Sequence, residues 1–298
     1  MLIEQYLQVN EICHQEKKAL SRYFFEREVA LGALDETAIL DKMERNLEVM
    51  EKAAADGLKG VDSFSGLSGG DAKRLLEYRS MGSPLGDSHY LEAAMNAVAI
   101  NEVNASMGII CATPTAGSSG VVPGVLLAFR DRLKLDRRKQ LDFLITSGGV
   151  GILIGNQASL SGAQGGCQSE VGSASAMAAA ALVEAAGGTP LQSGHALAIA
   201  LKNLLGLTCD PVASLVEVPC IKRNAIGAVN AIIAAEMALA GVESRIPVDE
   251  VIQAMGSIGR MMPVALRETA LGGLAQTPTA CRIMEMLQSK GHIDLKSL

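Results

Sequence analysis

The most clearly helical stretch of this chain is TPLQSGHALAIALKNLLG, residues 189–206. Its first residue, Thr189, is of a type that caps helix N-termini, and Pro190 follows where the first helical turn tolerates proline. Gly206 has the backbone freedom that a C-terminal cap requires. Alanine and leucine, which favour helix, fill the stretch between these signals. The segment therefore predicts one complete, capped helix.

The rest of the chain has the same helical character. Apolar residues make up 49% of it, but aromatic residues only 3%, and tryptophan is absent. Sheet proteins rely on aromatic and β-branched residues, whereas alanine, leucine and methionine favour helices. Further helices are expected over 86–107, 221–241 and 247–262. We expect an all-α fold, with a single mostly helical domain and glycine-rich loops.

A glycine- and serine-rich stretch at residues 61–71 marks the expected boundary within the 298 residues. Before it, residues 1–60 show charged, amphipathic helix patterns, and we expect them to form an N-terminal helical segment packed on the main domain. Residues 61–298 are expected to form that main domain. Neither an internal repeat nor a further linker follows.

The charge and apolar patterns argue against two classes of protein. The formal net charge is −6, and no block of lysine and arginine marks a nucleic-acid-binding face. Apolar windows such as 225–242 contain Asn230 and Glu236, so we expect no membrane span. The N-terminal stretch, MLIEQYLQVNEICHQEKK, has no apolar signal core. We therefore expect a cytoplasmic protein whose six cysteines are thiols or ligands rather than disulfides.

Three cysteines lie in stretches suited to holding a metal. Cys167 lies in GGCQSEVGSA, ahead of an alanine-rich helix, while prolines stand near Cys209 in TCDPV and before Cys220 in VPCIKRN. Proline fixes φ and restricts the residue before it, so such corners hold a cysteine in place. Three thiolates from separate segments suit an iron–sulfur cluster. With three ligands, one iron would stay open for substrate.

Other motifs have more ordinary explanations. Cys13, Cys111 and Cys281 fit small buried or half-buried thiols, and the four histidines form no metal-spaced pair. The G-x-S-x-G pattern at 66–70 lacks the strand that a serine hydrolase requires before it. A glycine turn at 149–155, with Glu170 at the distance of a ribose contact, lacks the second strand of a dinucleotide fold.

Hydroxyl groups gather ahead of an apolar helix, in a segment suited to binding a carboxylate through hydroxyls and backbone N–H groups. The candidate substrate-binding side chains there are Thr113, Thr115, Ser118 and Ser119. The alternative explanation is a capped helix start.

Three residues elsewhere are candidates for balancing charge around a cluster and its substrate: Lys73, Arg223 and Asn224. Each of them also fits a surface or packing position. Lys73 is the candidate catalytic base within the chain, and Asn224 is added to the substrate-binding candidates.

The chain resembles the α subunit of the two-chain, iron–sulfur-dependent L-serine dehydratases (L-serine ammonia-lyases) of Gram-positive bacteria. The similarity runs from SGLSGGDAKR at residue 65 to ETALGGLAQTPTA ending at residue 280. Its most specific parts are EVNASMG (102–108), PTAGSSGVVPGVL (114–126), SGAQGGCQSEVGSASAMAAAALVE (161–184), LGLTCDPVASLVEVPCIKRNA (205–225) and ETALGGLA (268–275). Ser169 and Gln164 depart from the usual family residues but leave the cysteine frame intact.

The resemblance implies that Cys167, Cys209 and Cys220 hold a [4Fe-4S] cluster in a catalytic domain spanning 61–298. It also implies a partner β subunit that carries a Ser-His-Thr substrate element, and a role in amino-acid degradation and gluconeogenesis. Single-chain relatives can cap the open iron with a C-terminal cysteine. This chain ends in KGHIDLKSL, so we expect no such capping.

The implied reaction is β-elimination of water from L-serine, giving pyruvate and ammonia, with the open iron as Lewis acid. The base is expected in the partner chain or at Lys73. Glycine-rich segments at 147–166 and 65–71 are expected to leave an open mouth around the cluster. The alternatives are a cysteine desulfidase-type lyase and a non-catalytic iron–sulfur sensor or scaffold.

Overall fold

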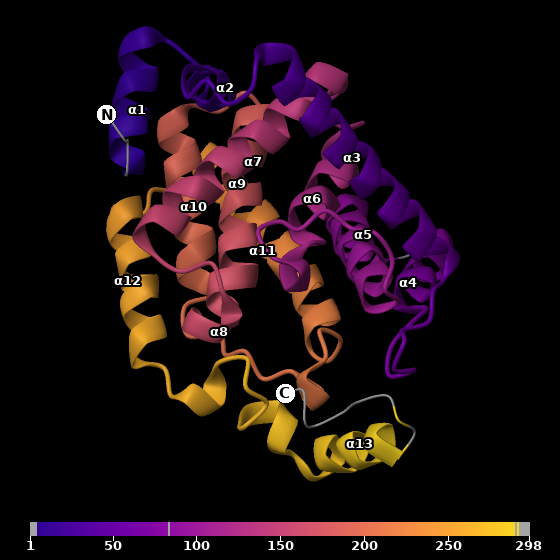
Figure 1. The fold of residues 1–298 in the computed structure, drawn as a ribbon. Coiled ribbons are helices and arrows are strands. Elements are labelled where there is room, and N and C mark those ends of the chain that lie inside the picture. The colour runs from indigo at the N-terminus through magenta and orange to yellow at the C-terminus, as the bar shows by residue number, and fades with distance from the viewer. Residues whose placement is uncertain (1–4, 83, 290, 292–298) are drawn as a thin grey trace.

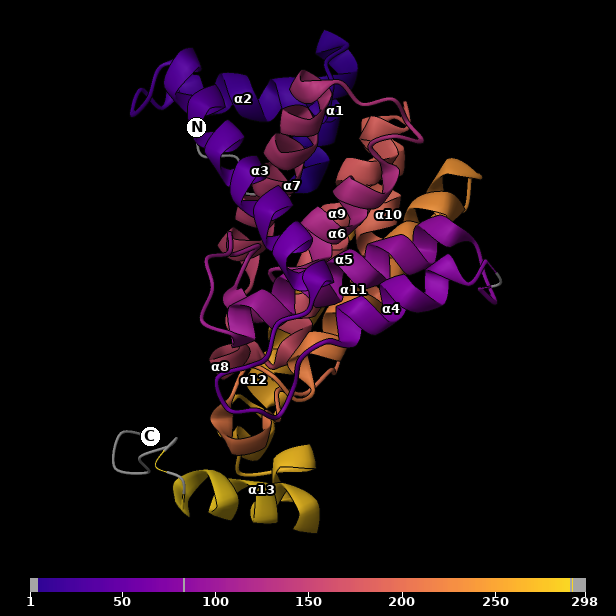
Figure 2. The same ribbon diagram turned by 90° about the vertical axis from the view of Figure 1, so that its right-hand side faces the viewer.

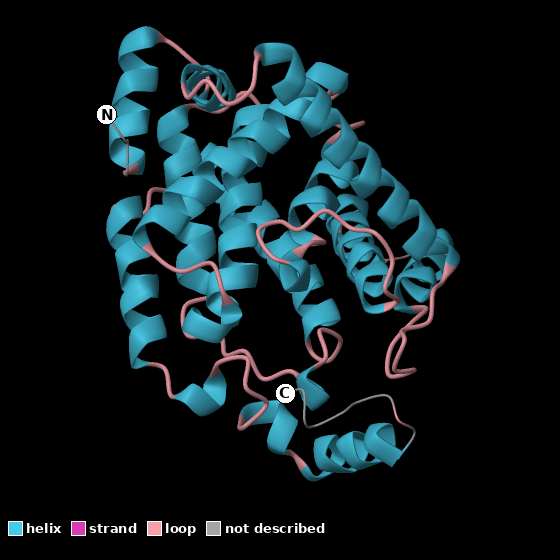
Figure 3. Ribbon diagram, viewed as in Figure 1, coloured by secondary structure: helices cyan, strands magenta, loops and turns pink. Residues whose placement is uncertain are grey.

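The computed structural model describes residues 5–82, 84–289 and 291, and over these residues it forms helices and loops but no strand (Figure 3). The α-helices are α1 Tyr6–Glu16, α2 Leu20–Ala30, α3 Glu36–Lys59, α4 Asp71–Ser80, α5 Ser88–Ala105, α6 Val121–Phe129, α7 Arg137–Gln157, α8 Gly162–Gly165, α9 Ser173–Ala185, α10 Pro190–Asn203, α11 Cys220–Leu239, α12 Val248–Met261 and α13 Pro278–Ser289. The expectation of a single all-α domain is confirmed.

Helix α9 is the centre of the bundle, with α6, α7, α10 and α11 packed around it (Figure 1). Every residue from Ser173 to Val183 is buried, and most of them are alanine. Small side chains on all faces let the neighbouring helices approach closely, and full burial explains why the helix has no polar face. The alanine-rich sequence is therefore the packing surface on which the other helices assemble.

Helix α10 matches the opening prediction closely. Thr189 and Gln192 form a capping box: the Thr189 hydroxyl accepts from the Gln192 N–H at 3.2 Å, and the Gln192 side chain accepts from the Thr189 N–H at 2.9 Å. The helix ends at Asn203, three residues before Gly206, which has φ of 85°. The expected helix and its N-terminal cap are thus confirmed, but the C-terminal cap is Leu204 rather than Gly206.

The N-terminal helices share the core of the bundle. Tyr6, Leu20, Phe24 and Leu47 are buried in the same apolar cluster as α9 and α10. Asp249, in the first turn of α12, accepts hydrogen bonds from the backbone N–H groups of Tyr6 at 2.8 Å and of Leu7 at 3.0 Å. These contacts fix α1 against α12. The expected boundary at residue 60 stays a prediction.

The glycine-rich segment at 147–166, which was expected to leave an open mouth around the cluster, is helical in its first part. Residues up to Gln157 belong to α7, where a Cβ at Gly149 would overlap the Phe24 ring. Gly149 is therefore a close-packing position between α2 and α7, and Gly151 packs on Met177 of α9, whereas a Cβ at Gly148 would meet nothing within 4 Å. Because these glycines belong to α7 and none of them lines the cysteine cavity, the expectation that they form an open mouth is wrong. The second part of the segment does reach the cysteines, through Ser161 and Gly162.

Helix α13 lies at the end of the bundle opposite α1 and α2 (Figures 1 and 2). Its buried residues Ala280 and Leu287 pack against Val212 and Ala213 of the loop between α10 and α11. The terminal stretch KGHIDLKSL lies outside the described residues except for Gly291. Among the described helices, none combines the length and the apolar character needed to cross a membrane.

Candidate functional site

The three cysteines predicted as ligands line one cavity of ≈ 280 Å³. Cys167 stands before a π-helical turn, Gln168–Gly172, that leads into α9; Cys209 lies in the loop after α10; and Cys220 is the first residue of α11. The full lining is Thr115, Ala116, Gly117, Ser161, Gly162, Cys167, Glu170, Cys209, Pro211, Val216, Cys220 and Glu268.

Backbone and side-chain hydrogen bonds join the segments that carry the cysteines. The Gln168 N–H donates to the Leu207 carbonyl at 3.0 Å, and the Gln168 side chain accepts from the Gly206 N–H at 2.8 Å. The Cys209 N–H donates to the Leu266 carbonyl at 2.9 Å. These bonds position Cys167 and Cys209 relative to each other and to the segment that follows α12.

Arg223 is a cation that acts on the sulfur atoms of the site. Its guanidinium donates to the Thr208 carbonyl at 2.7 Å and to Asp210 at 2.8 Å, and it interacts with the sulfur of Cys167. The expectation of charge balance at the cysteines therefore fits the position of Arg223. Lys73 differs: α4 turns Ala72 into the core and leaves Lys73 exposed against Gly60, away from the residues that line the cavity.

Burial disfavours ionisation of the three cysteine thiols when no metal is bound. Burial, and then the charge of Glu170, raises the pKa of Cys167 to about 11 despite the opposing effect of Arg223. Burial and the neighbouring Cys167 raise the pKa of Cys220 to about 12. The pKa of Cys209 is also raised, by burial and then by Glu170. Three thiolates together require a compensating positive charge, and three soft sulfur donors are the set that an iron–sulfur cluster uses. The residues therefore fit such a cluster.

Two carboxylates complete the cavity, and sequence reasoning did not assign either of them to it. Glu170 is 8% exposed and accepts a hydrogen bond from the Thr115 hydroxyl at 2.7 Å. Its other oxygen lies 3.7 Å from the sulfur of Cys209. Ligand atoms of Glu170, Cys209 and Glu268 lie within 4.8 Å of one another. Burial raises the pKa of Glu170.

Both carboxylates stand in stretches of sequence that the cysteines and the family resemblance had already marked. Glu170 stands three residues after Cys167, and Glu268 opens the ETALGGLA stretch. The π-helical turn rather than a regular α-turn carries Glu170, and such turns occur often at functional sites.

Of the four hydroxyl-bearing candidates in the hydroxyl-rich turn, Thr115 is the one among the residues that line the described cavity, together with Ala116 and Gly117. The Ser118 hydroxyl donates to the Thr113 carbonyl at 3.1 Å, and the Thr113 hydroxyl donates to the Ser119 carbonyl at 3.2 Å. These bonds hold the turn from within, and Ser118 and Ser119 are fully buried.

Asn224 ties this turn to the helix that begins at Cys220. Its amide donates to the carbonyls of Gly117 at 2.7 Å and of Cys220 at 2.9 Å, and its side-chain oxygen accepts from the Gly120 N–H at 3.0 Å. Asn224 is buried and lies outside the described cavity lining. Its contacts are those of a residue that positions the turn beside a cysteine.

A family model described as the serine dehydratase alpha chain matches residues 4–275 of the sequence. The chain belongs to this family. Its cysteine cavity and hydroxyl-rich turn both fall within the matched residues.

Sequence matches to relatives in this family extend over most of the chain. It is 57% identical over 269 residues to a probable L-serine dehydratase alpha chain of Bacillus subtilis (strain 168), a match that covers 90% of each chain. It is 43% identical over 285 residues to the L-serine dehydratase alpha chain of Peptoniphilus asaccharolyticus, covering 95% of this chain and 98% of that one. It is 38% identical over 274 residues to the L-serine dehydratase of Helicobacter pylori, covering 90% of this chain but 60% of that protein.

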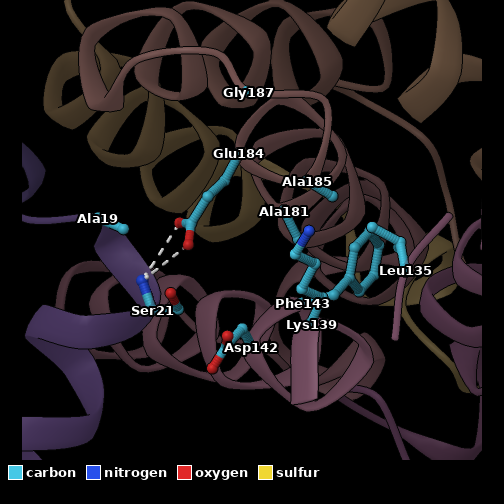
Figure 4. A pocket seen from close by; sticks show the side chains of 10 residues that line it. All are labelled: Ala19, Ser21, Leu135, Lys139, Asp142, Phe143, Ala181, Glu184, Ala185 and Gly187. Carbon is cyan, nitrogen blue, oxygen red and sulfur yellow. Dashed lines mark hydrogen bonds between the residues drawn. The ribbon is translucent and has the colours of Figure 1, made fainter. Parts of the chain in front are cut away.

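A second cavity of ≈ 330 Å³ lies at the other end of α9 in this protein and contains a half-buried carboxylate, Glu184 (Figure 4). Glu184 accepts a hydrogen bond from the Ser21 N–H at 3.2 Å and one from the Thr146 hydroxyl at 2.9 Å. Ser21 is in the first turn of α2, so the carboxylate satisfies a free N–H group there. No cysteine is among the residues that line this cavity. Glu184 therefore has a structural task.

Proposed function

We propose that this chain is the α subunit of an L-serine dehydratase, which removes water from L-serine and releases pyruvate and ammonia. The observation that carries the proposal is the cavity lined by Cys167, Cys209 and Cys220 together with the carboxylate of Glu170. The names of the B. subtilis and P. asaccharolyticus relatives point to the same reaction.

The cofactor proposed for this site is a [4Fe-4S] cluster held by Cys167, Cys209 and Cys220. When bound, it supplies an iron with an open position that acts as a Lewis acid toward an oxygen of the substrate. The burial of the three sulfurs supports this assignment, because their protons are held tightly unless a cation replaces them.

The chain's own groups bind and orient the substrate. Thr115, Ala116 and Gly117 form one wall of the cavity. The remaining substrate-binding candidates, Thr113, Ser118, Ser119 and Asn224, keep this wall in shape. Loss of the Cα proton and of hydroxide from Cβ gives 2-aminoacrylate, which tautomerises and hydrolyses to pyruvate and ammonium.

The general base is proposed to come from the partner chain rather than from Lys73. The residues that line the described cavity include no lysine, arginine or histidine. An elimination that passes through a reactive enamine also needs a site closed to water, and a second chain over the cavity would provide this closure.

The partner is proposed to be a β subunit. The P. asaccharolyticus relative is named an alpha chain, and this chain covers 98% of it. The H. pylori L-serine dehydratase is matched over 60% of its length, so that protein has a further part that this chain does not match. We propose that a separate β subunit supplies the corresponding part here.

The test is anaerobic loading of the purified chain with iron and sulfide, addition of the β subunit, and measurement of the α-keto acid formed. L-Serine, L-threonine and L-cysteine are compared side by side, with each chain alone as a control. The proposal expects pyruvate from L-serine with the mixture and little from either chain alone.

Other outcomes would replace the proposed function. Faster release of sulfide from L-cysteine than of pyruvate from L-serine would indicate a cysteine desulfidase-type lyase. A fully loaded complex that turns over none of the three amino acids would indicate an iron–sulfur sensor or scaffold.

A further inference from the structure

We propose that Glu170 and Glu268 bind the α-ammonium group of the substrate, an assignment that rests on the proposed function and deepens it. Both side chains line the cysteine cavity, and the described lining has no basic residue. Two carboxylates in such a wall favour a ligand that brings a positive charge of its own. An α-amino acid does so through its ammonium group, whereas a 2-hydroxy acid does not.

The two carboxylate oxygens of Glu170 differ in their hydrogen-bond donors. Oε1 accepts from the Thr115 hydroxyl at 2.7 Å, whereas Oε2 faces the thiol of Cys209 at 3.7 Å. A cysteine that binds iron does so as a thiolate, which has no proton to donate. Oε2 would then be an acceptor without a donor in a site where Glu170 is 8% exposed, which is costly for a carboxylate. An ammonium group supplies both the donor and the charge.

Glu268 offers the second carboxylate from the mouth of the cavity. It is exposed, and its carboxylate has no hydrogen bond or ion pair among the described residues. The ligand atoms of Glu170 and Glu268 lie within 4.8 Å of each other, a spacing that one group with several N–H donors can bridge. One carboxylate thus lies deep and one lies at the entrance, so the ammonium can be bound as the substrate enters.

Two glycines leave room for the deeper carboxylate. A Cβ at Gly117 would lie 3.2 Å from Glu170 Oε1, and a Cβ at Gly162 would overlap Glu170 Oε2 and press on the sulfur of Cys209. Both glycines line the cavity. The wall is therefore shaped around the Glu170 carboxylate.

The test compares two non-reacting ligands that differ at the group in question. L-Alanine carries an ammonium and L-lactate a hydroxyl at the same carbon. Each is measured with the loaded α–β complex in two ways: as a competitor of L-serine, and by the shift of the unfolding temperature, which needs no turnover. The variants are Glu170→Gln, Glu268→Gln and the double variant. The matched control is Glu184→Gln, which removes a half-buried carboxylate with a raised pKa at the far end of α9.

The wild-type complex is expected to prefer L-alanine over L-lactate. Glu170→Gln is expected to raise the KM for L-serine about 10- to 100-fold, the cost of losing a charge-assisted hydrogen bond, and to reduce the preference for L-alanine. The double variant should lose the preference, while iron content, the visible spectrum of the cluster and the behaviour of Glu184→Gln stay unchanged.

Two results would overturn the assignment. One is an unchanged preference for L-alanine in the double variant. The other is loss of iron from Glu170→Gln, which would make this carboxylate a ligand of the cluster instead. Failure of the proposed function is recognised separately, because a loaded wild-type complex would then form no pyruvate from L-serine, while the alanine–lactate comparison by unfolding temperature would still report on the carboxylates.

Discussion

The guanidinium of Arg223 and the carboxylate of Asp210 form an ion pair at 2.8 Å, with side chains only 14% and 6% exposed. The other oxygen of Asp210 accepts from the Leu274 N–H at 2.8 Å. The pair therefore joins α11 to the loop of Cys209 and to the segment that follows Glu268, at Leu274. This ion pair therefore helps to fix the geometry of the cysteine cavity.

Replacing Asp210 with asparagine is expected to lower the free energy of unfolding by about 3 kcal/mol, because it leaves a buried cation without its charge partner. Urea unfolding of the chain without iron measures this change. The matched control is Asp131→Asn, since Asp131 is 96% exposed and lies 3.8 Å from Arg130. Surface pairs of this kind contribute little. Equal changes in the free energy of unfolding for the two substitutions would show that the Arg223–Asp210 pair does not stabilise the cavity.

Alanine at Cys167, Cys209 or Cys220 is expected to abolish loading of a four-iron cluster, because each removes one of three thiolates. Alanine at Cys281, which is exposed, or at Cys111, which is half-buried, should leave loading unchanged. The measurement is iron and sulfide per chain together with the visible spectrum after anaerobic loading. Full loading in any of the first three variants would remove that residue from the ligand set.

A loaded site with only three thiolates is expected to be sensitive to oxygen and chelators. Activity of the α–β complex should fall in air and return with iron, sulfide and thiol under argon. Pyruvate formation that continues unchanged after prolonged exposure to air and a chelator would argue for a different cofactor.

Two adjacent glycines in α7 should respond in opposite ways to alanine. A Cβ at Gly148 meets nothing within 4 Å, so Gly148→Ala should stabilise the helix by about 0.5–1 kcal/mol. A Cβ at Gly149 would overlap the Phe24 ring, so Gly149→Ala should destabilise the fold by about 1–3 kcal/mol as α2 shifts away. Thermal unfolding of both variants is the measurement. If the segment were flexible rather than packed, the two substitutions would change the unfolding temperature in the same direction.

The contrast between these glycines also shows how far sequence could lead. Caps such as Thr189 and runs such as the alanines of α9 act through near neighbours in the chain, so α10 and the all-α fold were predictable. The three cysteine segments could be singled out because the cysteines and the prolines near them are visible in the sequence. The close approach of Gly149 to Phe24 was not, because it depends on how α2 and α7 pack.

The candidate site divides in the same way. Cys167, Cys209 and Cys220 were found by residue type, whereas the role proposed for Glu170 depends on the direction of its side chain. That direction is set by a π-helical turn and by room at Gly162, neither of which has a local sequence signature. Ser118 and Asn224 carry polar groups of the right kind, but their hydrogen bonds go to the backbone of the turn. Lys73 lies one residue after a buried alanine, and the helical turn carries its side chain outward.

The half-buried carboxylate of Glu184 predicts a pH dependence of stability that does not involve the cysteine cavity. Burial raises its pKa, and the hydrogen bonds from Ser21 and Thr146 oppose this effect only in part. A carboxyl group whose pKa is higher in the folded state stabilises the fold fully below its unfolded pKa of about 4.3 and loses this contribution as pH rises through the folded pKa. The free energy of unfolding should therefore rise as pH is lowered from about 7 to about 5.

Glutamine at position 184 keeps the shape and an acceptor but cannot ionise, so Glu184→Gln should flatten the rise in stability between about pH 7 and about pH 5. Carboxylates with lowered pKa values affect stability at a lower pH. Lys52 and Lys59 hold the pKa of Asp56 at about 2, so the stabilisation from the Asp56 carboxylate is lost only below this pH range. Urea unfolding of the iron-free chain across this range measures the slope, with Glu48→Gln at an exposed position as the control. A slope that is the same in wild type, Glu184→Gln and Glu48→Gln would show that Glu184 does not titrate in this window.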